Sequence, residues 1–78
     1  MVDVRLLAFG PVAERLGGRH HVVEVELGTT LQALVVHLGL SDWLGMGMAL
    51  AIDGTHVEAS TPIQGPVEIA LLPPVSGG

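Results

Sequence analysis

The sequence predicts a small α+β domain in which a sheet of four to five strands packs on one main helix. Apolar residues alternate with other residues at period two over residues 2–9 and 67–72, as in half-buried strands. Between these segments, apolar residues recur at i, i+3, i+4 and i+7 and form one helix face: Leu31, Leu34, Val35 and Leu38. With 78 residues, the chain holds one such domain.

The first half of the chain predicts two strands joined by a short helix. In the strand over residues 2–9, the core side carries Val2, Val4, Leu6 and Ala8, and the opposite side carries Asp3, Arg5, Leu7 and Phe9. Gly10-Pro11 ends this strand, because Pro11 suits the first turn of a helix over residues 12–16 that Gly17-Gly18 ends. The second strand covers residues 21–27, with Val23, Val25 and Leu27 pointing inward.

The second half predicts the main helix and three further strands. Thr30 can cap a helix over residues 30–38, and Gly39 stops it. Residues 40–47 are short, glycine-punctuated and contain Trp43, and they predict no clear element. A strand over residues 48–53, with Leu50 and Ile52 inward, turns at Asp53-Gly54 into a short strand over residues 55–59. The last strand, over residues 67–72, points Val67, Ile69 and Leu71 inward.

Composition excludes several classes of protein. The chain has no cysteine, which excludes disulfides and thiolate metal sites, so stability must come from a core built on its 49% hydrophobic residues. A net charge of −5, with three arginines and no lysine, argues against nucleic-acid binding. No apolar stretch approaches a membrane span, and the first residues do not form a signal peptide. We therefore expect a cytoplasmic protein with no membrane or nucleic-acid partner.

The end of the chain is its most informative segment. Proline fixes φ and lacks an N–H, so Pro73-Pro74 should end sheet pairing and start a stiff stem. Val75 and Ser76 then taper to Gly77-Gly78, which can enter a channel that excludes side chains. The α-carboxylate of Gly78 is ionised at neutral pH, so an outside enzyme would have to activate it. We divide the chain into a domain over residues 1–72 and an extended, flexible tail over 73–78. The alternative is an ordinary frayed terminus.

The ending Leu72-Pro73-Pro74-Val75-Ser76-Gly77-Gly78 resembles that of the small subunits of molybdopterin synthase, a family of ubiquitin-like sulfur carriers. Weaker similarity runs upstream through Ala51–Gly54, Thr61–Ile63 and Val67–Ala70, and through residues 8–17. Compared with the family, the segment between the helix and the central strand is shortened. The resemblance implies a β-grasp (ubiquitin-like) fold, with a mixed sheet whose last strand lies parallel beside the first. Residues 28–66 supply the long crossover that parallel pairing needs.

The resemblance also implies a function in molybdenum cofactor biosynthesis. A ubiquitin-activating-type adenylyltransferase would use ATP to adenylate the Gly78 carboxylate, and a sulfur donor would convert it to a thiocarboxylate. The tail over Pro73–Gly77 would then enter the large subunit of molybdopterin synthase, where Gly78 gives its sulfur to a pterin precursor. The chain itself would bind no cofactor and no metal. It shows no Ser-His-Asp or Cys-His set, so we expect a sulfur-donating subunit without catalytic side chains.

Strand parity identifies a docking surface. Leu7, Phe9 and Leu72 fall on the outward side of the first and last strands, where a solitary domain would prefer polar groups. We interpret them as partner-binding residues at the root of the tail; the alternative is ordinary exposed apolar residues. Three other functions stay open: a carrier for thiazole or cysteine synthesis, a ubiquitin-like protein modifier, and an interaction module with an inert tail.

Overall fold

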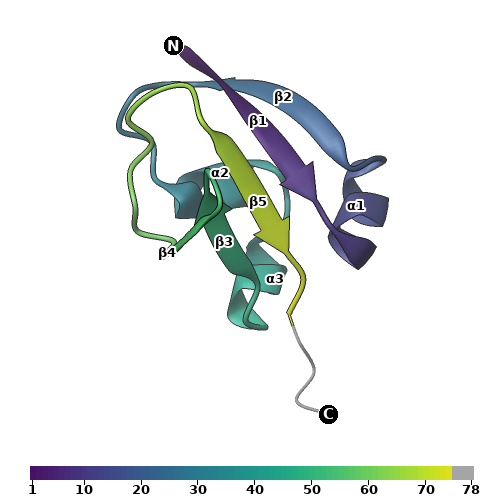
Figure 1. The fold of residues 1–78 in the computed structure, drawn as a ribbon. Helices are drawn as coiled ribbons and strands as arrows, with labels where there is room; N and C mark the ends of the chain where they lie inside the picture. Colours follow the sequence, from purple (N-terminus) through teal and green to yellow (C-terminus); the bar gives the residue numbers. More distant parts are fainter. Residues whose placement is uncertain (75–78) are drawn as a thin grey trace.

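The computed structural model describes residues 1–74, and its strands form one five-stranded sheet in the order β2-β1-β5-β3-β4 (Figure 1). The strands are β1 (Val2–Ala8), β2 (His20–Val25), β3 (Ala49–Ile52), β4 (Thr55–Val57) and β5 (Glu68–Leu72). β1 pairs antiparallel with β2 and parallel with β5, while β3 pairs antiparallel with both β5 and β4. The predicted mixed sheet and the β-grasp fold are therefore confirmed.

The helices are α1 (Gly10–Leu16), α2 (Leu31–His37) and α3 (Ser41–Gly45). α2 is the main helix that the sequence predicts over residues 30–38. Thr30 caps it, since the Thr30 hydroxyl accepts a hydrogen bond of 3.1 Å from the Ala33 N–H. Leu38 ends it, and Gly39 follows with φ at 77°.

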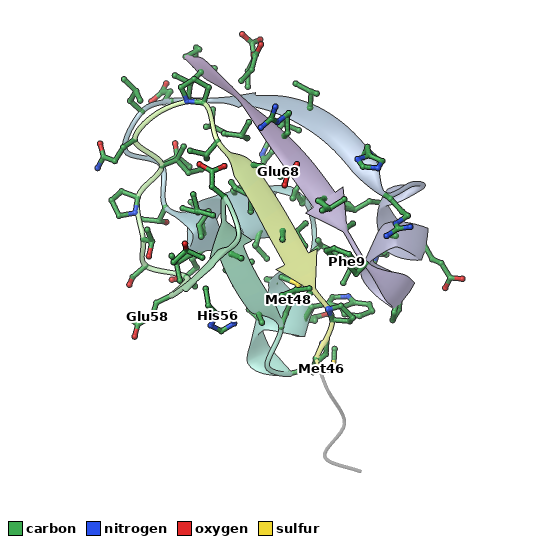
Figure 2. The ribbon with its side chains drawn as sticks, in the orientation of Figure 1. Phe9, Met46, Met48, His56, Glu58 and Glu68 are labelled. Atoms are coloured by element: carbon green, nitrogen blue, oxygen red, sulfur yellow. The ribbon has the colours of Figure 1, made fainter. Side chains whose placement is uncertain are left out.

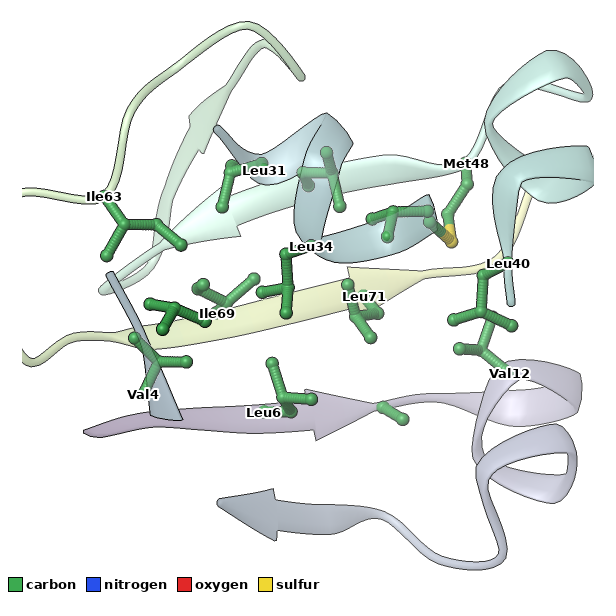
Figure 3. Packing of buried hydrophobic residues seen from close by; sticks show 14 of the residues in the cluster. Val4, Leu6, Val12, Leu31, Leu34, Leu40, Met48, Ile63, Ile69 and Leu71 are labelled. Atoms are coloured by element: carbon green, nitrogen blue, oxygen red, sulfur yellow. The ribbon is translucent and has the colours of Figure 1, made fainter. Parts of the chain in front are cut away.

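The core lies between α2 and one face of the sheet (Figure 3). Leu31, Leu34 and Val35 of α2 are buried in the same cluster as Val4, Leu6 and Ile69, with Leu38 and Ile52 half-buried against it. This is the packing that the two periodicities predict. Among residues 1–74 no polar or charged side chain is buried, so apolar burial provides the stability of the domain.

The inward position predicted for Leu27 is wrong. β2 ends at Val25, and Leu27 is 59% exposed rather than inward. The chain turns here, because the Thr29 N–H donates to the Glu26 carbonyl at 3.1 Å. The next residue pairs with a loop instead of β1, since the Gly28 N–H donates to the Ile63 carbonyl at 2.8 Å. Period two continues in the sequence beyond the point where the ladder stops.

Other boundaries shift by a few residues. α1 begins at Gly10 rather than Val12, and β4 ends at Val57 rather than Ala59. Residues 40–47, which predict no element, contain α3. A helix of five residues is too short to display a period of 3.6, so only its packing reveals it. Leu40 is fully buried, and Trp43 and Leu44 pack on the core.

No helix within residues 1–74 is long and apolar enough to cross a membrane.

Replacing Leu34 tests the core assignment. Leu34 is 2% exposed, so Leu34→Ala should lower the free energy of unfolding by about 2–5 kcal/mol, measured by urea denaturation. Val36 lies on the same helix but is 54% exposed, so Val36→Ala should change stability by less than about 0.5 kcal/mol. Equal losses for the two variants would contradict the packing of α2.

Candidate functional site

The root of the tail lies beside the end of β1, although the two segments are far apart in sequence (Figure 1). Parallel pairing aligns Ala8 with Leu71, and the Phe9 N–H donates to the Leu71 carbonyl at 3.3 Å. β5 then ends at Leu72, and Pro73 is the first residue beyond it. The start of α1 and the start of the tail are therefore held together by the central strand pair.

Pro73 lies next to Gly10 at this junction. A Cβ built on Gly10 would lie 3.5 Å from Cγ of Pro73, and both Pro73 and Pro74 are half-buried. Gly10 has φ at +53°, a conformation that L-residues with a side chain rarely adopt. The stem thus starts from a defined position on the domain. The predicted roles of Val75, Ser76, Gly77 and Gly78 lie outside the described residues, and the division between domain and tail stays a prediction.

The three predicted docking residues, Leu7, Phe9 and Leu72, are all half-buried. On β5 the residues alternate, with Ile69 and Leu71 fully buried and Leu72 on the face opposite the core, as strand parity predicts. On β1, Leu7 likewise lies between the buried Leu6 and Ala8.

Three alanines connect these residues into one surface. Ala70 lies directly opposite Leu7, Ala51 lies opposite Ala70, and Ala49 lies opposite Leu72. All are on the face of the sheet away from α2, where Ala49 and Ala70 are half-buried and Ala51 is buried. We call this set the tail-root patch: Leu7, Phe9, Ala49, Ala51, Ala70 and Leu72. Sequence analysis found the large members but missed the alanines, because an alanine signals neither a core nor an interface by itself.

Charged and polar side chains border the patch. The Arg19 guanidinium carbon lies 5.6 Å from the centroid of the Phe9 ring, within the range of a cation–π contact. In the sheet, Arg5 lies opposite Glu68, and this pair is two residues along the strands from the pair of Leu7 and Ala70. The Glu68 N–H donates to Asp53 Oδ1 at 3.0 Å. An apolar centre with a charged rim is the arrangement of a binding surface.

Met46 is a further candidate that sequence analysis missed. It follows α3, it is 59% exposed, and it lies at the end of the sheet where β5 runs out (Figure 2). The pairing of Ala49 with Leu72 explains this location, because Met46 is only three residues before Ala49. The sequence signal that could have indicated an exposed Met46 is its position between two glycines, Gly45 and Gly47.

The tail-root patch is an apolar surface of the described residues. Residues 1–74 contain no group of three or more His, Cys, Asp or Glu that could hold a metal ion. No member of the tail-root patch carries a nucleophilic or titratable side chain.

Comparison with known proteins decides the family. The ThiS family model matches residues 6–78, nearly the whole chain. The chain belongs to the ThiS family. The predicted resemblance to ubiquitin-like sulfur carriers is thereby confirmed at the level of the family. No curated protein matches the chain.

Solved structures with similar folds include two kinds of protein. A chain of the complex of subunits 1 and 2 of molybdopterin-converting factor from Helicobacter pylori is 29% identical, with a TM-score of 0.64, over 99% of this ThiS-family chain and 100% of that one. Small archaeal modifier protein 1 from Haloferax volcanii is 21% identical, with a TM-score of 0.77, over 96% and 100%. At that lower identity the second likeness establishes the fold alone.

Gly10 provides a test of the tail root. Because Gly10 has positive φ, Gly10→Ala should lower the free energy of unfolding by about 1–2 kcal/mol in urea denaturation. Gly45→Ala is the matched control, since Gly45 lies in α3 without positive φ and has open space where a Cβ would go. It should raise stability by about 0.4–1 kcal/mol. A neutral Gly10→Ala would mean that the junction does not require its left-handed conformation.

Proposed function

We propose that this protein is a sulfur carrier in molybdenum cofactor biosynthesis, acting as the small subunit of molybdopterin synthase. The observation that carries the proposal is the parallel pairing of β1 with β5, which roots the tail beside the apolar patch. Two findings support it. The family match runs to Gly78, and the Helicobacter pylori chain from the converting-factor complex is 29% identical over its full length.

The reacting group is the α-carboxylate of Gly78. A carboxylate is a poor electrophile, so an adenylyltransferase first joins it to the AMP portion of ATP and releases pyrophosphate. Sulfide supplied by a donor then attacks the acyl carbon, and AMP leaves, which gives a thiocarboxylate. Within the large subunit its nucleophilic sulfur bonds to the pterin precursor, and water then cleaves the bond between this sulfur and the Gly78 acyl carbon, which restores the carboxylate. Two such transfers supply the two sulfurs of the dithiolene.

The folded domain positions this end. Binding through the tail-root patch makes delivery of the tail effectively intramolecular, because the patch surrounds Pro73 where the stem starts. The same patch serves the adenylyltransferase and the large subunit in turn, since both must receive the tail. The acid–base groups come from these partners. The protein binds no cofactor of its own, ATP being a substrate of the activating enzyme, and it works in the cytoplasm.

A second candidate is a ubiquitin-like protein modifier, because the fold also matches small archaeal modifier protein 1. Activation of Gly78 would be the same, but the acyl group would end on an amine of another protein. This chain contains no lysine, so it could not extend itself through side-chain amines. A carrier for thiazole or cysteine synthesis is the alternative within sulfur transfer, and the pterin-conversion assay separates it.

Changing the length of the tail tests the proposal most directly. One alanine added after Gly78 would move the reactive carbonyl by about 3.3–3.6 Å. A misplacement of about 1 Å can already cost on the order of 100-fold in rate. We therefore expect the extended variant, and a variant lacking Gly78, to lose sulfur acceptance by at least about 100-fold. The assay combines the activating enzyme, ATP and a sulfur source, and then measures intact mass and pterin conversion.

Thermal melting is the control for these variants. All residues of the core lie between Val4 and Leu71, so both tail variants should melt like the parent. Normal sulfur transfer by the extended protein, with the added residue still present by mass, would refute the proposal. High-mass conjugates of the parent without thiocarboxylate would instead identify a protein modifier.

Substitutions in the tail-root patch test docking. Leu7→Glu and Leu72→Glu place a charge on the apolar centre of the patch, and each should weaken binding to the large subunit at least about tenfold, measured by calorimetry. Val36→Glu is the matched control, since Val36 is an exposed apolar residue on α2, which packs on the opposite face of the sheet. It should bind like the parent. Equal weakening by all three variants would show a general charge effect and no role for the patch.

A further inference from the structure

β2 is a free edge of the sheet. Strand order places it at one end, and β1 is its only strand partner within residues 1–74. The opposite edge, β4, has three residues, whereas β2 has six (Figure 1). A long edge strand presents unpaired N–H and C=O groups to which another strand can add. The side chains of β2 determine which strand fits.

Backbone phase identifies the residues that face this edge. The Ala8 N–H donates to the Arg19 carbonyl at 2.8 Å, so Ala8 and Arg19 form a hydrogen-bonded pair. In an antiparallel ladder such pairs alternate, and the register assigns His21, Val23 and Val25 to the same class. His20, Val22 and Glu24 therefore direct their N–H and C=O groups away from β1, toward the open edge.

These three residues also expose their side chains. Val22 is 66% exposed at the middle of β2, and His20 and Glu24 are exposed on either side of it. All three lie on the face of the sheet away from α2, opposite Leu7, Arg5 and Asp3 of β1. The edge thus carries an apolar centre with an imidazole, a hydrogen-bond donor, at one end and a carboxylate acceptor at the other. That pattern is complementary to itself when the direction of the strand is reversed.

Only one antiparallel register satisfies both the backbone and the side chains. With Val22 opposite Val22 of a second copy, each His20 lies opposite the other copy's Glu24, and all three pairs use edge-facing backbone groups. A slip of one residue pairs edge-facing groups with groups already bonded to β1. A slip of two places Val22 opposite His20 or opposite Glu24 and loses the complementary pairs. Apolar pairs and hydrogen-bonded polar pairs directly across a ladder stabilise it.

We propose that β2 pairs antiparallel with β2 of a second copy of this chain, with a twofold axis at Val22, to form a continuous ten-stranded sheet. The interface is isologous, because each copy contributes the same residues. The axis runs perpendicular to the sheet, so both outer faces point the same way. β5 lies beyond β1 from the interface, which leaves both tail-root patches and both tails accessible. A dimer could therefore present two carrier ends at once.

The interface is small, so the dimer is weak. A strand of six residues is about 20 Å long, and its pairing buries less than the roughly 1,000 Å² of a stable interface. The net charge of −5 on each copy also opposes association. We expect dimers to form at about 0.1–1 mM, a range that sedimentation equilibrium and hydrogen exchange both reach.

The test compares the parent with variants that change only the edge. Val22→Lys places two like charges on the twofold axis and should weaken association at least about tenfold. His20→Glu sets Glu against Glu24, and Glu24→Lys sets Lys against His20, so each single variant should also weaken it. The double variant His20→Glu/Glu24→Lys places a carboxylate of one copy opposite an ammonium of the other and should recover association to within about threefold of the parent. Thermal melting checks that each variant is folded, and the comparison of the two single variants with the double variant carries the test if Val22→Lys does not fold.

Each result supports or overturns the proposal. Concentration-dependent dimerisation that Val22→Lys abolishes and the double variant restores supports it, together with slowed exchange of the His20, Val22 and Glu24 amides at high concentration. An unmodified protein that is monomeric at about 1 mM overturns the proposal. A double variant that associates no more tightly than the two single variants also overturns it. Slowed exchange of these amides only when the activating enzyme or the large subunit is added would assign the edge to that partner and also overturn the proposal.

Discussion

The parallel pairing of β1 with β5 is the constraint on which the rest of the molecule depends. Parallel neighbours require a long crossover, and residues between the two strands supply it with α2 as its central helix. The crossover places α2 on one face of the sheet and leaves the other face open. The same pairing brings Leu72 and Pro73 to the end of β1. The core, the tail-root patch and the root of the tail thus follow from one pair of strands.

The two faces of the sheet differ in how deeply their side chains are buried. The inner face is aliphatic, and its Leu6, Ile69 and Leu71 are buried beneath α2. No disulfide is available, so the free energy of folding comes from this burial. The outer face combines half-buried Leu7 and Leu72 with alanines. An apolar surface of this kind contributes little to the isolated domain, and a partner can cover it without competing with the core.

The two edges of the sheet differ in length and in the side chains that they carry. β4 is short and is followed by a long loop, whereas β2 is long and carries an alternation of charge and apolar side chains around Val22. The tail-root patch lies between these edges, over the central strands. The patch and the free edge adjoin at His20. This residue lies opposite Leu7 of the patch, and its backbone N–H and C=O groups face the free edge. The pairing proposed at β2 and the docking proposed at the patch would therefore use neighbouring surfaces.

Local periodicity by itself determined the order of the strands and the main helix along the chain. It also determined the inward residues of β1, α2 and β5 and the outward position of Leu7 and Leu72. These follow from the sequence because period two and period 3.6 are properties of the local backbone. Tertiary structure decided the rest. Leu27 continues the pattern of β2, yet turn bonds to Glu26 and Ile63 end the ladder first. The alanines of the patch and the contact of Gly10 with Pro73 join residues distant in sequence, and only the register of the sheet brings them together.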